Sequence, residues 1–138
     1  MKKSKFVVSI MVLVLCTAFI SCKQEKKDAP TIKITYNGEV KTNGETIEAN
    51  VGEEVTITAE YDAQGYLEAI RFLMFSNHQA FLGHVFASPA YFGKKNTSHK
   101  VTETVKFEHA GEVQIEAHVM DCQKEALSSD FKMTVNVK

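Results

Sequence analysis

The chain has 138 residues and a formal net charge of −1 at pH 7, with 44% hydrophobic and 24% charged residues. Lysine and arginine are scattered among aspartate and glutamate, so there is neither the basic footprint of a nucleic-acid-binding protein nor an acidic tail. A chain of this length supports one hydrophobic core and no second domain of similar size.

The first 21 residues have the three-part layout of a secretory signal peptide. Three lysines near the amino terminus form a positive region, residues 6–19 form an apolar run, and the small residue Ser21 precedes Cys22. The apolar run is shorter than the roughly 20 residues that a permanent membrane helix needs. We therefore expect residues 1–21 to be removed.

Residues 19–22 read FISC and resemble the bacterial lipobox, in which a cysteine follows a large apolar residue, a tolerant position and a small residue. The resemblance implies a lipoprotein in which Cys22 is lipidated, the chain is cleaved before it, and the new amino terminus receives a palmitate-type acyl chain. Because each buried methylene contributes about 0.8 kcal/mol, two or three chains anchor far more firmly than one. An ordinary cleaved signal ending near Ser21 is the alternative.

Residues 22–30 are polar and charged and end at Pro30, a composition that predicts a tether between a membrane and a domain. The run resembles those of Bacteroidota lipoproteins, in which an acidic stretch after the cysteine accompanies display on the outer face of the outer membrane. Here lysines and acids are mixed. We expect attachment to the outer membrane through lipid on Cys22, with the periplasmic and surface sides both open.

Cysteine counting leaves one thiol in the mature chain. Cys16 is lost with the signal and Cys22 carries lipid, so Cys122 remains and no intramolecular disulfide forms. A single cysteine on a strand behaves as a small buried hydrophobe. The alternative is a reactive thiol with His118, four residues upstream, as its base.

From residue 31 onward apolar residues alternate with polar ones, the period of a strand with one buried face. Such strands pair antiparallel. The alternation predicts regular strands at 31–36, 54–61, 112–120 and 131–137 and less regular ones at 67–75 and 101–107. The segment 67–75 is apolar on both faces toward its end, as is typical of a central strand. Glu103 interrupts the alternation, which indicates a bulge or a sheet edge. Turns are expected at several glycines, among them Asn37-Gly38, Asn43-Gly44 and Gly83.

These strands predict an all-β fold, an immunoglobulin-like antiparallel β-sandwich of about seven strands that spans residues 31–138. The stretches NVGEEVTITAEY and HAGEVQIEAHVMD resemble polycystic-kidney-disease-like and related bacterial immunoglobulin-like modules, which carry G-x-x-V-x-I early and A-G-x-Y-x-I late. Tryptophan, a disulfide pair and the tyrosine of a tyrosine corner are absent from the sequence. The resemblance therefore implies the fold class and no subfamily.

Residues 72–93 form an uncharged segment that holds more than half of the aromatic residues remaining after the signal. One interpretation buries these rings in the core. The other leaves some of them exposed as a patch that contacts a glycan or a partner protein, since exposed apolar patches mark binding surfaces. The candidate ligand-binding residues are those beyond the central strand: Phe81, Phe86, Tyr91 and Phe92.

Metal and catalytic motifs are missing. His78 and His84 are secondary candidates for a metal site across a hairpin, and Asp62 and Asp121 for calcium at one end of the sandwich, but no H-x-H, H-x-x-H or C-x-x-C spacing occurs. We find no G-x-S-x-G, no glycine-rich phosphate loop and no H-E-x-x-H. The sequence therefore predicts no cofactor and no enzyme activity.

Three functional hypotheses follow from these observations. The first is a lipid-anchored binding or assembly module of the cell envelope that contacts a glycan or a partner protein. The second is a structural accessory subunit or spacer of an outer-membrane complex, without a small ligand. The third is a metal-handling lipoprotein that uses His78 and His84. Fold class alone does not distinguish them.

Overall fold

The computed structural model describes residues 28–77, 79–87, 96–121 and 127–138, with only the backbone of residues 79, 80, 86 and 87. This part of the chain contains no helix that is long and apolar enough to cross a membrane. It folds into nine strands: β1 (Thr31–Tyr36), β2 (Glu39–Lys41), β3 (Thr46–Ala49), β4 (Glu54–Asp62), β5 (Leu67–Ser76), β6 (Gln79–Ala87), β7 (Ser98–Lys106), β8 (Gly111–Asp121) and β9 (Ser128–Val137).

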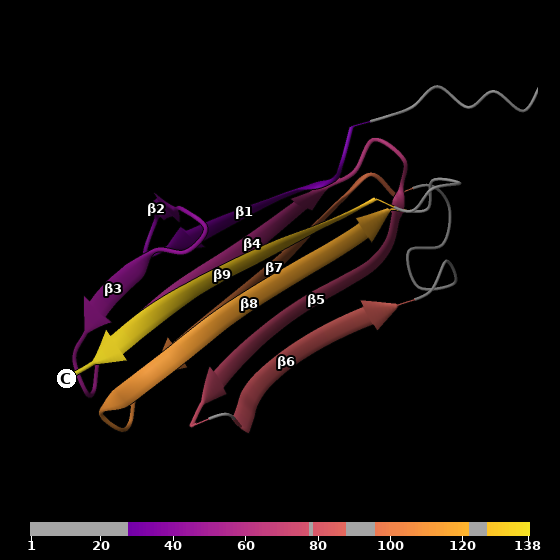
Figure 1. Cartoon of the computed structure of the whole chain (residues 1–138). Coiled ribbons are helices and arrows are strands. Elements are labelled where there is room, and N and C mark those ends of the chain that lie inside the picture. Colours follow the sequence, from indigo (N-terminus) through magenta and orange to yellow (C-terminus); the bar gives the residue numbers. More distant parts are fainter. Residues whose placement is uncertain (1–27, 78, 88–95, 122–126) are drawn as a thin grey trace, which may run out of the picture.

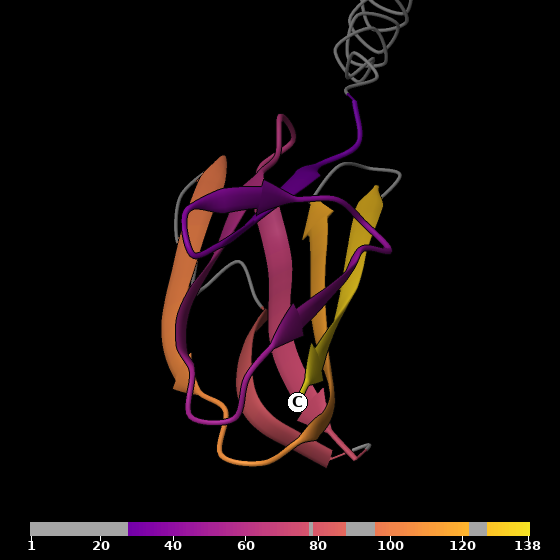
Figure 2. The ribbon, with the colours of Figure 1, turned by 90° about the vertical axis from the view of Figure 1, so that its left-hand side faces the viewer.

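The strands form two sheets that pack face to face (Figures 1 and 2). One sheet has the strand order β2-β1-β4-β7 and the other has the order β3-β9-β8-β5-β6. In the amino-terminal part of the chain, β1, β2 and β4 belong to the smaller sheet and β3 to the larger one. The chain then crosses between the sheets after β4, after β6 and after β7. This is the topology of an immunoglobulin-like sandwich whose larger sheet carries an additional hairpin strand, which confirms the predicted fold class.

Two details of the predicted sandwich are wrong. β3 pairs with β9 in parallel, although all strands were expected to pair antiparallel. The β2–β3 loop holds β3 in this position, because Gly44 N donates to the carbonyl of Lys132 (2.7 Å) and Lys132 N donates to Asn43 Oδ1 (2.8 Å). The described residues also form more than about seven strands, because the short β2 and β3 and the uncharged β6 are additional.

The core lies between the sheets and is built from the residues that the alternation predicted to face inward. On β4 and β8 the fully buried apolar residues include Val55, Ile57, Ala59, Tyr61, Ile115 and Val119. Burying one large aliphatic or aromatic side chain of this kind contributes about 1.5–3 kcal/mol. The two sheets are therefore held together chiefly by this shared apolar layer.

Two glycine predictions have different outcomes. Asn37 and Gly38 have φ values of 48° and 85°, as the tight turn between β1 and β2 requires, so the predicted turn is confirmed. Gly83 does not form a turn, because it lies inside β6 and pairs with Leu73 of β5. There a Cβ atom would meet Leu73 Cδ2 at 2.9 Å, so the glycine leaves room for the leucine side chain beside it.

The sandwich has two distinct ends (Figures 1 and 2). We call the end at which β1 begins the tether end, because the predicted tether leads into it. Ser129 Oγ donates a hydrogen bond to the carbonyl oxygen of Pro30 (2.6 Å) and fixes the last tether residue to β9. β4, β6 and β8 finish at this end, whereas the β5–β6 turn and the β7–β8 loop lie at the opposite end, which we call the far end.

Candidate binding surfaces

The outer face of the five-stranded sheet divides into a polar half and an apolar half. On β8 and β9 it carries cross-strand ion pairs, His118 Nδ1 with Asp130 (2.7 Å) and Lys132 Nζ with Glu116 (2.7 Å). On β5 and β6 it carries mainly apolar side chains, with the charged Arg71 among them. We call Leu73, Phe75 and Val85 the apolar half of this face.

Strand register places these three residues outward. Phe72 and Met74 of β5 are completely buried, so Leu73 and Phe75, which alternate with them, project from the opposite face and are only half-buried. Val85 pairs with Arg71, the next outward position on β5, and is 62% exposed. A valine this exposed on a continuous sheet surface offers apolar contact area without disturbing the core.

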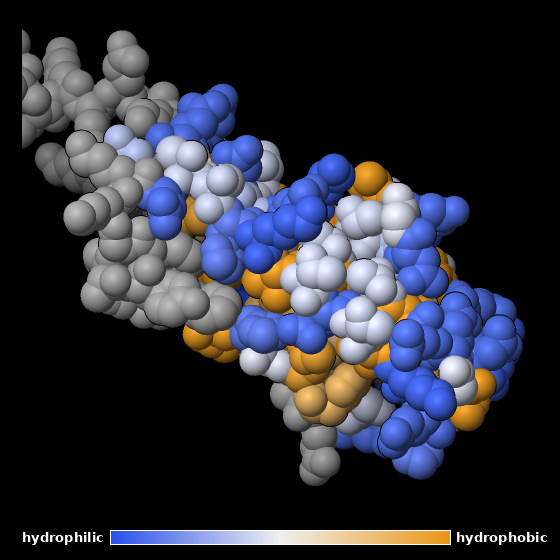
Figure 3. All heavy atoms as spheres, turned by 180° about the vertical axis from the view of Figure 1, so that it is seen from behind, coloured by the Kyte–Doolittle hydropathy of each residue, from blue (hydrophilic) through white to orange (hydrophobic). Residues whose placement is uncertain are grey.

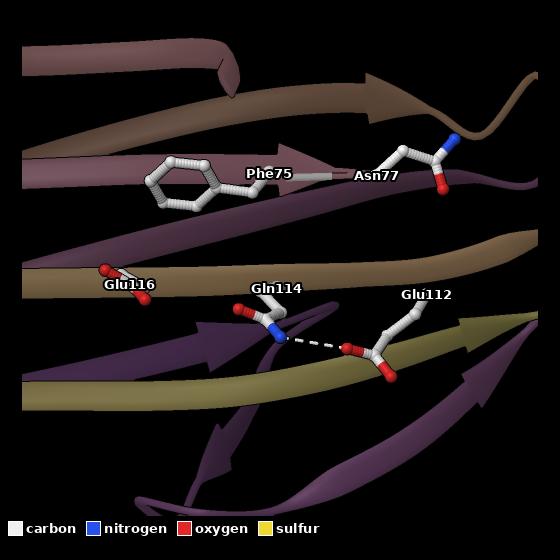
Figure 4. Close-up of a pocket in the computed structure, with 5 residues that line it drawn as sticks. All are labelled: Phe75, Asn77, Glu112, Gln114 and Glu116. Atoms are coloured by element: carbon white, nitrogen blue, oxygen red, sulfur yellow. Dashed lines mark hydrogen bonds between the residues drawn. The ribbon is translucent and has the colours of Figure 1, made fainter. Parts of the chain in front are cut away.

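A groove of about 390 Å³ lies where the apolar half meets β8 near the far end (Figure 4). Phe75 pairs directly with Gln114, so that an aromatic ring lies beside a carboxamide. Gln114 Nε2 donates to Glu112 Oε1 at 2.9 Å, which fixes the carboxamide along β8. The other lining residues are Asn77 and Glu116. The groove thus combines one aromatic ring with carboxamide and carboxylate groups.

A second, more apolar groove of about 320 Å³ opens at the far end between β6 and the β7–β8 loop. Phe81 lies in it and is 49% exposed. The neighbouring apolar residues are Val105, Phe107 and Val113, and His109 lies at the same groove. This groove is therefore open to solvent at the end of the sandwich that lies away from the tether.

The outer face of the four-stranded sheet is different in chemistry. Thr56 and Thr58 of β4 pair with Thr104 and Thr102 of β7 through hydroxyl contacts of 3.3 and 3.1 Å. Figure 3 looks at the molecule from behind Figure 1 and shows this side mainly as hydrophilic and near-neutral residues, with hydrophobic residues in small areas between them and at the edges. The sandwich therefore has one polar outer face and one outer face that is half apolar.

Charges near the tether end of the polar face neutralise one another. A broad hollow of about 660 Å³ there contains Lys33, Glu60 and Lys100. Glu60 accepts from Lys33 at 3.1 Å and from Lys100 at 3.3 Å. The hydrogen bonds from these two ammonium groups, Lys33 first, hold the pKa of the Glu60 carboxyl below its usual range. Asp62 lines the same hollow, so the two lysines there are balanced by two carboxylates.

The metal candidates do not come together in the described part of the chain. His84 forms a close hydrogen bond with Glu103 across the open edge between β6 and β7. The sequence offered a bulge or a sheet edge as the reason why Glu103 interrupts the alternation of apolar and polar residues. β7 lies at the edge of its sheet, which agrees with the second explanation. His78 lies outside the described residues. Within the described ranges no three potential metal-binding side chains gather at one point.

The two aspartates considered for calcium have different environments. Asp121 is completely buried, and its Oδ1 accepts a hydrogen bond from Leu127 N at 3.1 Å. Asp121 N also donates to the carbonyl of Leu127 at 3.0 Å. Asp62 instead lies on the exposed side of β4 at the hollow described above. The buried aspartate therefore has a structural role at the base of the β8–β9 connection.

The predicted aromatic patch is only partly described. Phe81 is exposed near the start of β6, as the patch hypothesis requires. The backbone of Phe86 pairs with Ile70 further along β6, and its side chain is not described. Tyr91 and Phe92 lie outside the described residues. Phe81 and the end of β6 are about 20 Å apart, given the rise of a strand, and lie toward opposite ends of the sandwich.

Sequence reasoning missed Phe75 as a surface residue. The sequence predicts a central strand at residues 67–75 that is apolar on both faces toward its end. For the aromatic rings of residues 72–93 it offers two interpretations, burial in the core or exposure as a patch, and it does not name Phe75 among the exposed rings. The phase of the alternation carries the missing signal. Once Phe72 and Met74 are assigned to the core, Phe75 must face outward.

Comparison with known proteins adds no family assignment. No family model and no curated protein matches the chain. Among solved structures, it is similar to the crystal structure of the CARDB domain of the PF1109 protein from Pyrococcus furiosus in complex with di-metal ions. The TM-score is 0.43 and the sequence identity is 11%, and the match covers 82% of this chain and 99% of that one. The solution structure of the same domain gives a TM-score of 0.42 at 9% identity over 81% of this chain and all of that one.

A second type of structure is similar at a comparable level. The ASH / PapD-like domain 7 of human CEP192 gives a TM-score of 0.37 at 11% identity over 84% of this chain and 91% of that one. Similarities of this size indicate nothing about ligands. The class of the protein, an immunoglobulin-like β-sandwich, rests on its own strand order and pairing.

Proposed function

We propose that this chain is a lipid-anchored binding module of the bacterial cell envelope, attached to the outer membrane through Cys22 and without catalytic activity. It contacts a glycan or a partner protein through the apolar half of the outer face of its larger sheet. The observation that supports this most directly is the different chemistry of the two outer faces. One carries threonine pairs, and the other carries Leu73, Phe75 and Val85.

The geometry of the sandwich supports the same proposal. If Cys22 is anchored, the tether end faces the membrane, because Pro30 is bonded to β9 at that end. Both grooves then lie towards the end of the sandwich that is away from the bilayer. A binding surface placed in this way is accessible to envelope components on whichever side of the outer membrane the protein resides.

The anchor is tested by metabolic labelling with a palmitate analogue. We expect the wild-type chain to incorporate label and to fractionate with the outer membrane, whereas Cys22→Ser loses both properties. Incorporation that persists in Cys22→Ser would contradict the anchor. Proteinase treatment of intact cells then distinguishes the periplasmic from the surface side.

The binding face is tested by photo-crosslinking in the intact envelope. Val85 and Val40 provide a matched pair, since each is a valine with 62% exposure, one on each sheet. Val40 pairs with Thr35 on the outer face of the smaller sheet. We expect a photoreactive residue at position 85 to form a specific adduct and one at position 40 to form none. Equal patterns would refute the assigned face, and the absence of any adduct would favour the spacer hypothesis.

A further inference from the structure

The groove beside Phe75 has the composition of a carbohydrate site. Its lining is more polar than that of the far-end groove at Phe81, yet it contains a half-buried aromatic ring. Figure 4 shows this ring on β5 next to the side chains that β8 contributes. Its volume of about 390 Å³ falls within the range of roughly 300–1,000 Å³ that is usual for small-molecule sites.

The polar groups in this groove retain unused hydrogen-bonding capacity. Gln114 uses one N–H on Glu112, which leaves its second N–H and its carbonyl oxygen for a ligand. Asn77 offers the same pair of groups, and each carboxylate accepts more bonds than it makes here. Donors and acceptors thus flank an apolar ring. A sugar matches this arrangement, because its hydroxyls both donate and accept while one face of its ring presents C–H groups.

The charges in the groove disfavour an anionic ligand. Glu116 is paired with Lys132 at 2.7 Å, and Glu112 receives its hydrogen bond from a neutral carboxamide. An anionic ligand would meet these carboxylates, so like-charge repulsion disfavours acidic polymers and nucleic acids. The mostly polar lining equally disfavours a purely apolar ligand, which would leave these groups without partners.

The groove continues across the sheet. A smaller hollow of about 140 Å³ shares Gln114 with it and extends over β9 to Gly44, with Lys132 and Thr134 along its length. The loop that bounds it is fixed by the bond from Gly44 N to the carbonyl of Lys132. Two adjoining hollows joined at one carboxamide suit a chain of several sugar rings better than a single ring.

We propose that this groove binds a neutral oligosaccharide of pyranose units, which runs from Phe75 across Gln114 towards Gly44. One ring stacks on Phe75, and its hydroxyls bond to Gln114, Glu112 and Asn77. This inference rests on the proposed function, since it names the ligand class of the same outer face. It places the sugar at the border of the apolar half rather than on Val85.

The test measures binding by titration calorimetry with the full chain in detergent micelles. The probes are the neutral oligomers cellohexaose, maltohexaose and chitohexaose, an oligogalacturonate as the acidic probe and hexalysine as the cationic probe. We expect saturable binding of at least one neutral oligomer. Phe75→Leu should weaken it by about tenfold, since the aliphatic side chain keeps apolar area but loses the flat ring. Gln114→Ala should weaken it by about three- to tenfold.

Val40→Ser is the matched control, since it changes an equally exposed valine on the outer face of the other sheet, away from the groove. It should leave sugar affinity unchanged, and circular dichroism should show that all three variants keep the β-sheet spectrum. Binding of hexalysine or oligogalacturonate alone, or of no probe, would overturn the inference. So would a sugar affinity that neither Phe75→Leu nor Gln114→Ala reduces.

The two proposals fail in different experiments. A specific adduct at Val85 together with no binding of any neutral oligomer overturns the sugar site and leaves the binding face in place. Sugar binding that depends on Phe75 without any adduct at position 85 restricts the contact surface to the groove and excludes Val85 from it. The titration and the photo-crosslinking therefore give separate results.

Discussion

The paired substitutions Tyr61→Phe and Tyr36→Phe test how buried hydroxyls stabilise the sandwich. Both side chains face the core, with 1% and 6% of their surface exposed. Tyr61 Oη donates a hydrogen bond to the carbonyl oxygen of Arg71 at 3.0 Å and so links β4 to β5 in the other sheet. Tyr36 Oη is buried without a hydrogen-bond partner among the described residues. The same atom is thus removed from two different environments.

We expect Tyr61→Phe to lower the free energy of unfolding by about 1 kcal/mol, the net contribution of one hydrogen bond. Tyr36→Phe should leave it unchanged or raise it slightly, because an unsatisfied polar group is removed. In urea, with m of about 1–3 kcal/mol/M for a small domain, the first loss shifts the midpoint by roughly 0.3–1 M. The partner of Tyr36 on β4 is Ile57, about 13 Å along the strand from Tyr61, so the two effects should add.

The assay is equilibrium unfolding in urea at neutral pH, followed by far-ultraviolet circular dichroism, for the wild type, both single variants and the double variant. An unchanged m-value would show that only stability has changed. If Tyr36→Phe destabilised the protein as much as Tyr61→Phe, the stability difference could not be assigned to the hydrogen bond with Arg71. The reasoning about these hydroxyls would then be refuted.

Three further predictions concern stability. Burial, and then the charge of a nearby glutamate, raises the pKa of Tyr36 from 10.0 to about 12. The unfolded chain therefore loses this proton at lower pH than the folded protein, so the free energy of unfolding falls as pH rises between these two values. The urea midpoint should fall less steeply with pH in Tyr36→Phe than in the wild type. An equal dependence of the urea midpoint on pH in both proteins would contradict this. A double-mutant cycle with His84→Leu and Glu103→Leu should give a coupling of about 0.5–1 kcal/mol by urea unfolding, and zero coupling would show that the pair adds nothing. Gly52→Ala should lower the free energy of unfolding by about 1 kcal/mol, because φ is +87° there. Gly83→Ala should change it by less than about 0.5 kcal/mol, since only the end of the Leu73 side chain must move. Equal thermal midpoints of the two variants would contradict this difference.

Much of the fold could be predicted because strand alternation is a local property of the chain. Residues 54–61 and 131–137 alternate without exception, and their apolar positions are the buried ones. The turn at Asn37-Gly38 was equally predictable, since an Asn-Gly pair readily adopts the positive φ values that this turn requires. Gly83 was misassigned because a glycine in a strand and a glycine in a turn look the same in sequence.

The candidate site could not be predicted to the same extent, because its residues come together only through register. Phe75 and Gln114 are far apart in the chain, and the pairing of β5 with β8 places them side by side. In the same way, Glu103 contacts His84 because β7 and β6 are the edge strands of the two sheets and lie on the same side of the sandwich. No local pattern in either strand specifies such a contact.

The sequence by itself determined the all-β class, the inward-facing residues and the prediction of a lipid attachment at Cys22. Each of these depends on neighbours within a few residues. Only the tertiary structure decided which strands pair, which rings of the uncharged segment reach the surface, and which carboxamides lie beside them. Those outcomes depend on pairing between distant strands, because a shift of one residue in register would move every side chain of a strand to the other face.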